Sequence, residues 1–267
     1  MRSPSVPLPI QQIVTFASAP FRGNPAFVVT LDKPRPTPVL QSICRELHGA
    51  VLAVLSTEGD EVDLRFVTPG GTHPGPGHAT HAAAFVVLSR LRPGRSIDIR
   101  VEGGGHRSAR MEGDVLSVDW PVMPYVGIDR IGALRDCFGH APLDTYDSSF
   151  GLVAVFADDQ EVAALKPDFV ELTRLSSDTV IVTAPATRAD FAVRVFAPKL
   201  DLPEDPVCGT AHRVLVPFWA RRLGRRELVS HQLSERGGEL HCRLDGDTVT
   251  IAGRAIAFLD GTISLPD

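Results

Sequence analysis

Two segments in different halves of the chain share one local pattern, and this repetition constrains the fold more than any other feature of the sequence. Residues 65–69 read Arg-Phe-Val-Thr-Pro, and a Gly/Pro loop, Gly77 and an apolar run follow them. Residues 194–198 read Arg-Val-Phe-Ala-Pro, and a Pro/acid loop, Gly209 and a second apolar run follow those. Two matches in the same order favour a duplicated architecture. We therefore expect two halves built on one plan.

The break between the halves is expected near residues 119–124, Asp-Trp-Pro-Val-Met-Pro, because two prolines interrupt the strand pattern there. The predicted domains are residues 1–120 and 121–267, with the last strand free to return to the first half. With 23 glycines and 22 prolines in 267 residues, many short elements are expected. Strands are predicted over 10–16, 26–30, 50–56, 62–67, 96–102, 107–111, 115–120, 149–156, 180–183 and 192–196.

Helices are predicted over 39–47, 78–88 and 168–175, and in a long apolar stretch that runs to residue 223. The run over 78–88 is apolar on nearly every face beyond His81, which predicts a helix that is buried all round. The last helix is expected to end where Arg221 and Arg222 precede Gly224. Pro217 should kink this helix or limit it.

Composition excludes several classes of protein. A net charge of −5 without a basic stripe disfavours nucleic-acid binding. No segment reaches the roughly 18 apolar residues of a membrane span, and the N-terminus has no signal-peptide core. The four cysteines are far apart and form no CxxC pair, so we expect neither a disulfide framework nor a metal site. A reducing cytoplasm is the expected location.

The two glycine-led helix starts could bind an anion. A glycine lets a ligand approach backbone N–H groups, and the helix dipole adds a partial positive charge there. Gly77 with His78, and Gly209 with Thr210, would together suit a carboxylate substrate. For either loop alone, a glycine that only serves its turn explains the pattern equally well.

Groups able to move protons lie beside these loops. Asp205 and Cys208 precede the second helix, where a thiol can have a lowered pKa and act as a base. Structural histidines and a small packing cysteine are the alternative explanation. The histidines that flank the loops are His73, His78, His81 and His212. No nucleotide-binding or zinc-hydrolase motif is present.

Five segments together resemble the PhzF-like family of phenazine biosynthesis, which has the diaminopimelate epimerase fold. In order, they are residues 20–26, 65–69, 77–80, 204–212 and 232–238, within a span of roughly 10 to 262. The resemblance implies an α+β fold with two pseudo-symmetric halves, each a β-sheet or barrel around a central helix, and an active site in the cleft between them. It also implies a homodimer and proton shuttling without a cofactor.

The catalytic pattern of the family is incomplete in this sequence. PhzF-like enzymes carry a proton-shuttling glutamate in a stretch that resembles S-E-T-A-F, and alignment without gaps from residues 43–46 puts Val51 there. Epimerase relatives use two cysteines instead. The first would stand where this chain has Pro76, and the second matches Cys208.

The preferred interpretation is a cofactor-independent isomerase that moves a proton or double bond in a small carboxylated amino- or imino-acid-like intermediate. Antibiotic or other secondary-metabolite biosynthesis is the expected setting, and the acid/base set is non-standard. The alternatives are a lyase on the same scaffold, or a protein that binds a small carboxylate or a partner. The expected catalytic residues are Asp205, His78 and Cys208. The expected substrate-binding residues are Gly77, Gly209 and Thr210 for the carboxylate and Asn24 for a polar group.

Overall fold

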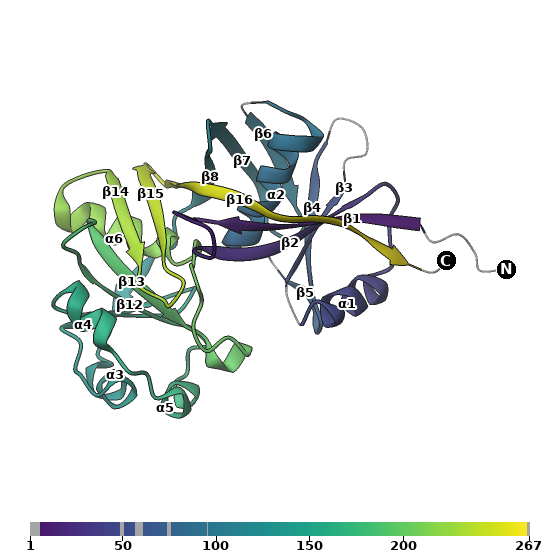
Figure 1. Ribbon diagram of the computed structural model, residues 1–267. Coiled ribbons are helices and arrows are strands. Elements are labelled where there is room, and N and C mark those ends of the chain that lie inside the picture. The colour runs from purple at the N-terminus through teal and green to yellow at the C-terminus, as the bar shows by residue number, and fades with distance from the viewer. Residues whose placement is uncertain (1–5, 49–50, 57–60, 74–75, 95, 266–267) are drawn as a thin grey trace. The chain divides into compact units, whose positions relative to one another are not determined.

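A computed structural model describes residues 6–48, 51–56, 61–73, 76–94 and 96–265. The chain divides into two compact units (Figure 1). Unit 1 contains residues 1–20, 25–119 and 253–267, and unit 2 contains residues 21–24 and 120–252. The predicted loop over 70–77 and the predicted strand over 50–56 each include residues outside the described ranges. Among the described residues, no helix is long and apolar enough to span a membrane.

Unit 1 is a mixed α+β unit. Its strands are β1 Val6–Thr15, β2 Asn24–Leu31, β3 Leu52–Ser56, β4 Asp63–Thr68, β5 Gly71–His73, β6 Ser96–Val101, β7 Gly105–Glu112, β8 Val115–Pro121 and the later part of β16 Thr248–Leu265. Its helices are α1 Thr37–Glu46 and α2 Gly77–Val86, which continues as a π-helix over Val87–Leu91. The sheet order is β1-β2-β3-β4-β6-β7-β8, and β16 pairs antiparallel with β1.

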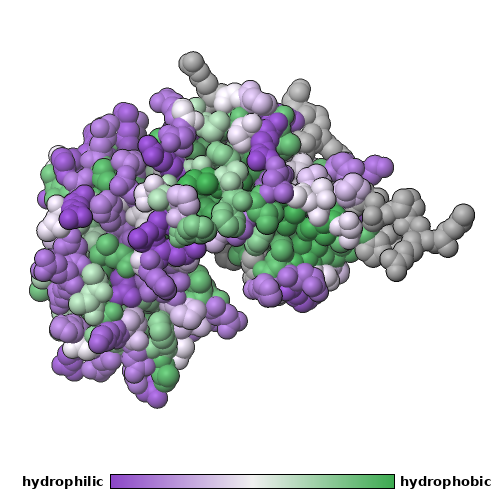
Figure 2. Space-filling view, viewed as in Figure 1, coloured by the Kyte–Doolittle hydropathy of each residue, from purple (hydrophilic) through white to green (hydrophobic). Residues whose placement is uncertain are grey.

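Helix α2 is the centre of unit 1 and is buried as predicted. It contacts β1, β3 and β7, which lie in different parts of the sheet. Every residue of α2 except the partly exposed His78 and Phe85 is buried, so most of the helix surface is covered by protein. A second core lies under α1, where Leu40 and Ile43 pack with Val29 and Leu52. Figure 2 shows hydrophobic residues gathering around the end of β16, which packs partly buried against this core.

Unit 2 is a second α+β unit. Its strands are β9 Tyr125–Gly127, β10 Asp144–Ser148, β11 Leu152–Val155, β12 Val180–Pro185, β13 Phe191–Phe196, β14 Glu227–Gln232, β15 Gly238–Asp245 and the start of β16. Its helices are α3 Ile131–Phe138, α4 Asp159–Ala164, α5 Phe169–Arg174 and α6 His212–Leu223, with a 3-10 turn over Pro198–Leu200. The sheet runs in the order β9 to β16, and the pairs β11–β12 and β13–β14 are parallel.

Alternate side chains of the unit 2 strands face different helices. Val180 and Val182 of β12 point into a core with Leu134 of α3 and Leu172 of α5. Thr183, the next residue along β12, accepts a hydrogen bond from the Trp219 indole of α6 at 3.0 Å. Since neighbouring residues of a strand point to opposite faces, α3 and α5 cover one face of this sheet and α6 covers the other.

The end of α6 is confirmed, and of the two effects predicted for Pro217, a kink or a limit, the limit does not occur. Gly224 adopts the left-handed conformation with φ 66° and closes the helix. The helix continues through Pro217 to Leu223. A proline leaves the carbonyl four residues earlier without its helical partner. Here the N–H of Met123 donates to that carbonyl, of Arg213, at 3.0 Å, so the helix tolerates the proline.

Candidate functional site

The predicted site residues occupy two places in the chain. Asn24 and the segment from Asp205 to Thr210 lie in unit 2, before α6. Gly77 and His78 are the first two residues of α2 in unit 1.

Asp205 is held by a set of short hydrogen bonds. Its carboxylate accepts from the Asn24 side-chain amide at 2.8 Å and from the Val207 N–H at 3.1 Å. Its own N–H donates to the carbonyl of Val195 at 2.9 Å, which ties the loop to β13. The remaining bond of the Asn24 amide goes to the Val207 carbonyl at 2.9 Å. The carboxylate therefore has a fixed position.

Burial gives Asp205 an unusual acidity. Although part of the residue reaches the surface, the carboxyl is enclosed by protein, and its desolvation raises the pKa to about 6. Hydrogen bonds from Cys208, Val207 and Asn24 lower the pKa, but they do not offset the desolvation. A carboxyl with this pKa exchanges its proton near neutral pH, as a general acid or base must.

The expected lowered pKa of Cys208 is wrong in direction. Burial is the largest influence and raises the thiol pKa, and the neighbouring Asp205 raises it further. Backbone N–H groups of Thr210 and Ala211 lower the pKa, as a helix start should, but burial dominates. Cys208 is therefore a protonated thiol that is hydrogen-bonded to Asp205, and not a thiolate base at neutral pH.

Gln232 at the end of β14 clamps the Asp205 loop. Its side-chain N–H donates to the Asp205 carbonyl at 2.8 Å, and its side-chain oxygen accepts from the Cys208 N–H at 3.1 Å. The residue is only 2% exposed. Because both ends of the amide are used, its orientation is fixed. No role for Gln232 was predicted from the sequence, although this residue opens the segment 232–238 that carries part of the family resemblance.

His212, the first residue of α6, holds the other side of Cys208. Its Nδ1 lies 2.9 Å from the Cys208 carbonyl, and its Nε2 lies 2.5 Å from the Ser230 hydroxyl. Burial lowers the pKa of His212 to about 4, so the ring is neutral near pH 7. A carbonyl can only accept, so Nδ1 carries the proton and Nε2 accepts from Ser230. His212 is thus a structural partner of the loop.

The chain segment before β2 places Asn24. Gly23 donates its N–H to the Gly237 carbonyl at 2.8 Å, and its own carbonyl accepts from the Arg236 guanidinium at 2.7 Å. Arg22 donates to the carbonyl of Arg236 at 3.1 Å. These bonds join residues more than 200 positions apart, so the Asn24–Asp205 pair depends on the fold of the whole chain.

The two helix starts share one electrostatic feature. Neither α2 nor α6 has a side-chain cap or an acidic residue in its first turn. The partial positive charge at each start is therefore not offset by side chains of the same turn. At α2, Gly77 is buried, His78 is half-buried, and the Gly77 carbonyl lies 2.9 Å from the Nδ1 of His81. Within the described residues, no group of three or more His, Cys, Asp or Glu side chains is arranged to hold a metal ion.

Solved structures define the class of fold. A crystal structure of a PhzF-family phenazine biosynthesis protein from Enterococcus faecalis matches with a TM-score of 0.93 at 33% identity, over 97% of this chain and 100% of that one. A hydroxyproline epimerase from Agrobacterium vitis, with bound trans-4-hydroxy-L-proline, matches with a TM-score of 0.61 at 12% identity, over 100% and 95%. The second likeness concerns the fold alone. The fold is that of the PhzF and diaminopimelate epimerase-like proteins.

The family model for phenazine biosynthesis-like proteins matches residues 13–261, and the chain belongs to this PhzC-PhzF family. An uncharacterized isomerase of Pseudomonas aeruginosa is 38% identical, over 97% of this chain and 99% of its own length. A phenazine biosynthesis-like domain-containing protein of Mus musculus is 31% identical, over 96% and 99%. With relatives at 30–38% identity named as isomerases, the chain is an enzyme of the isomerase class.

Proposed function

We propose that the enzyme moves a proton, and with it a double bond, within a small carboxylated amino- or imino-acid-like intermediate of secondary metabolism such as antibiotic biosynthesis, without a cofactor. The buried carboxyl of Asp205, with its pKa of about 6, carries this proposal. As a carboxylate it takes a proton from a carbon next to the conjugated system. The electron pair left behind shifts the double bond, and Asp205 returns the proton to another carbon.

The two helix starts supply the binding part of the proposal. In unit 2, the Gly209 N–H and the Thr210 hydroxyl would hold the substrate carboxylate, helped by the uncapped start of α6. In unit 1, the Gly77 N–H at the uncapped start of α2 has the same capacity to bind a carboxylate. His78 would contact the amino or imino group and relay the proton. The amide of Asn24 already donates to Asp205 and Val207, so we assign it to positioning the acid rather than to contacting the substrate.

The acid/base set departs from the family pattern in this proposal. Val51, half-buried just before β3, occupies the position that we align with the family glutamate. Valine carries no proton, so the transfer rests on Asp205 with His78. A conjugated substrate with an acidified C–H suits such a reduced set, because its carbanion is delocalised and needs less help from a base.

Deuterium exchange tests the proposal without a known product. Cyclic imino acids and dienoic amino acids are incubated with the enzyme in D2O, and NMR follows wash-in at carbon. We expect exchange in at least one compound, a loss of at least about 100-fold in Asp205→Asn, and little change in the exposed neighbour Asp201→Asn. Full exchange in Asp205→Asn would refute the role of this acid.

Two further variants separate the remaining groups. Cys208→Ala should keep most of the exchange, because the raised pKa of the thiol keeps it protonated at neutral pH. Val51→Glu should raise exchange if our alignment of the family glutamate is right. Exchange that survives Asp205→Asn but disappears in Cys208→Ala would transfer the base role to the thiol. Binding of a candidate without exchange in any variant would favour the carboxylate-binding alternative.

A further inference from the structure

A pocket in unit 2 lies away from Asp205, on the side of the sheet that α3 and α5 cover. It is an open pocket of about 410 Å³, lined by Ile128, Asp129, Arg130, Asp147, Leu152 and Ser176. This volume falls within the range of small-molecule sites, about 300–1,000 Å³. The side chains of Ile128 and Leu152 give it an apolar floor that is continuous with the core under α3 and α5.

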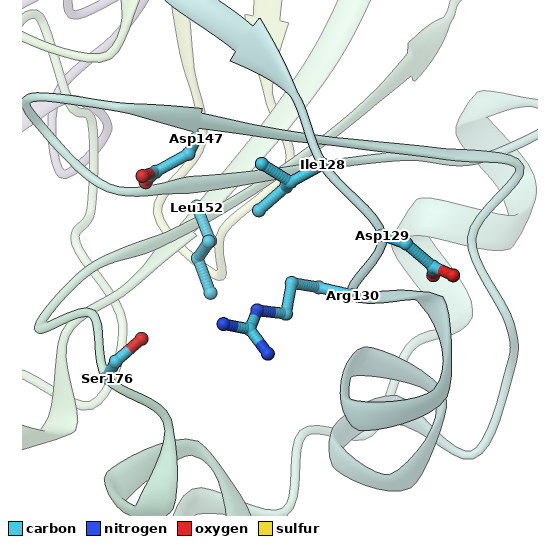
Figure 3. A pocket seen from close by; sticks show the side chains of 6 residues that line it. All are labelled: Ile128, Asp129, Arg130, Asp147, Leu152 and Ser176. Carbon is cyan, nitrogen blue, oxygen red and sulfur yellow. The ribbon is translucent and has the colours of Figure 1, made fainter.

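Three polar side chains surround this floor. Figure 3 shows the Arg130 guanidinium and the Ser176 hydroxyl directed toward the space below Leu152, with the Asp147 carboxylate on the far side of Leu152 from Arg130. Among the described residues, none of these three side chains forms a hydrogen bond or ion pair. One cationic, one anionic and one hydroxyl side chain therefore line the same pocket and can form hydrogen bonds with a ligand.

Asp129 differs from the other acid of the pocket. Its carboxylate points away from the hollow in Figure 3 and accepts the N–H of Ile131 at the start of α3. Its charge is therefore directed to the helix start, where an anion is favourable. Within the hollow, Arg130 and Asp147 leave one charge of each sign for a ligand.

The backbone that presents Arg130 is fixed. The Ile128 N–H donates to the Thr145 carbonyl at 3.0 Å, and the Thr145 hydroxyl donates to the Ile128 carbonyl at 2.5 Å. The same hydroxyl accepts from the Arg130 N–H at 3.1 Å. Thr145 is only 4% exposed, so these bonds are shielded from water. They hold residues 128–130, which follow β9, against β10.

The opposite wall is fixed by a close approach of two backbone segments. Leu152 donates its N–H to the Thr179 carbonyl at 3.0 Å, and the Ser177 hydroxyl donates to the same carbonyl at 2.8 Å. A Cβ at Gly151 would lie 2.3 Å from that carbonyl oxygen, so only glycine allows the approach. Ser176 and Leu152 therefore stand on segments that are tied to each other.

We propose that this pocket binds a small zwitterion with an apolar side chain, that is, an aliphatic α-amino acid. Arg130 and the Ser176 hydroxyl bind the carboxylate, Asp147 binds the ammonium, and Ile128 and Leu152 contact the hydrocarbon. Arg130, Asp147 and Ser176 are exposed, so each can reach a ligand from solvent, and only a ligand that carries both charges pairs with Arg130 and Asp147 together. The site does not depend on the reaction proposed for Asp205.

NMR titration with L-leucine as the probe tests the site on the full-length enzyme. Two analogues serve as controls, 4-methylpentanoate without the ammonium and 3-methylbutylamine without the carboxylate. We expect saturable amide shifts at residues 128–130, 145–152 and 176–179 with L-leucine, and binding at least about tenfold weaker for each analogue, since each loses one charge-assisted interaction. Shifts confined to residues 205–212, or equal binding of L-leucine and 4-methylpentanoate, would overturn the proposal.

Variants assign the contacts. Arg130→Gln should weaken L-leucine at least about tenfold, and Asp147→Asn should remove the preference for L-leucine over 4-methylpentanoate. Arg135→Gln is the matched control, because Arg135 is an exposed arginine of α3 outside the lining. Asp205→Asn should leave binding unchanged, which separates this site from the proposed reaction. Unchanged affinity in Arg130→Gln, or a loss in Asp205→Asn, would show that the pocket is not the site.

Discussion

The loop that leads into α6 and the start of α2 look alike in sequence but differ in what surrounds them. Both bring a glycine to the beginning of an apolar, uncapped helix. Before α6, Gln232 and Asn24 bind the loop and enclose Asp205, whose pKa is raised to about 6. At the start of α2, the Thr80 hydroxyl donates to the Pro76 carbonyl at 3.2 Å, within the first turn of the helix.

This difference shows what a helix start needs in addition before it can transfer protons. A helix start supplies N–H groups and a partial charge in both units, which suits binding. An acid that works near pH 7 needs more, because its carboxyl must be desolvated and still be held in place. Before α6, the side chains of Asn24 and Gln232, from distant segments of the chain, hold the loop that carries Asp205. We therefore assign binding to both starts and proton transfer to the second.

Among the interactions that distinguish the two helix starts, the hydrogen bonds of Gln232 should contribute most to the free energy of unfolding. Gln232→Leu leaves the Cys208 N–H and the Asp205 carbonyl without partners in a buried place, at about 1–3 kcal/mol each. We expect the free energy of unfolding in urea to fall by about 2–5 kcal/mol. At the start of α2, Thr80→Val should cost only about 1 kcal/mol, because the Thr80 N–H still donates to the Pro76 carbonyl at 3.1 Å.

Gln160→Leu, the same substitution at an exposed position of α4, controls for the change of residue type and should stay within about 0.5 kcal/mol. Equal losses for Gln232→Leu and Thr80→Val would mean that the two helix starts are held with similar strength. The contrast between them would then rest on acidity alone.

The pH dependence of stability should reflect two groups with opposite effects, Asp205 before α6 and His212 at its first position. The pKa of Asp205 rises from 3.8 to about 6 on folding, so its contribution is most favourable at acid pH and is lost as pH rises from about 4 to 6. The pKa of His212 falls from 6.5 to about 4, so its contribution is full at neutral pH and is lost as pH falls from about 6.5 to 4. Each pKa shift changes the free energy of unfolding by about 3 kcal/mol across its pH range, so the two contributions nearly cancel.

Asp205→Asn removes the contribution of Asp205 to the pH dependence of stability, so the contribution of His212 should become visible. Relative to the parent enzyme, its free energy of unfolding should fall by about 3 kcal/mol between pH 7 and pH 4. Urea unfolding at pH 4, 5.5 and 7 measures the difference between the two proteins, so other titrating groups drop out. A difference that does not change with pH would mean that the Asp205 pKa is ordinary, and the proton-transfer proposal would lose its main support.

Cys208 should react slowly with thiol reagents in the native enzyme. Its pKa is raised and the residue is 4% exposed, so modification by a disulfide reagent at pH 7 should require unfolding. Peptide mapping by mass spectrometry distinguishes Cys208 from the other three cysteines, which are buried as well. Rapid and selective labelling of Cys208 would mean that its pKa is lowered, as its position before α6 predicts from the sequence.

Much of the fold could be predicted from local patterns. The all-apolar run predicts the buried α2, and the two arginines before Gly224 predict the end of α6, because these signals lie within a few residues. Helix α3 was missed. It has only eight residues, buries Leu134, Cys137 and Phe138, and contains Gly132. So short an apolar face between glycines gives little periodicity to recognise.

The candidate site was harder to predict because its properties depend on distant partners. The sequence identified Asp205, Asn24 and Cys208, but the Asn24–Asp205 bond joins residues 181 positions apart. The direction of the Cys208 pKa shift was wrong because a helix start predicts stabilisation of a thiolate, whereas burial decides the outcome. Burial of a loop residue follows from tertiary packing, which no local pattern contains. Gln232 was missed for the same reason.

The ends of the two central helices offer the smallest test of how differently the units are built. Helix α6 stops at Gly224 with φ 66°, whereas α2 passes into a π-helix through Val87 without a glycine. A side chain in the left-handed conformation costs about 1 kcal/mol, so Gly224→Ala should lower the free energy of unfolding by about that amount. Nothing lies within 4 Å of a Cβ at Gly224, so the cost is conformational and not steric. Gly224→Asn should recover part of it, because asparagine tolerates this conformation. If Ala and Asn are equally costly, the end of α6 is fixed by contacts beyond its last turn rather than by the left-handed conformation of Gly224.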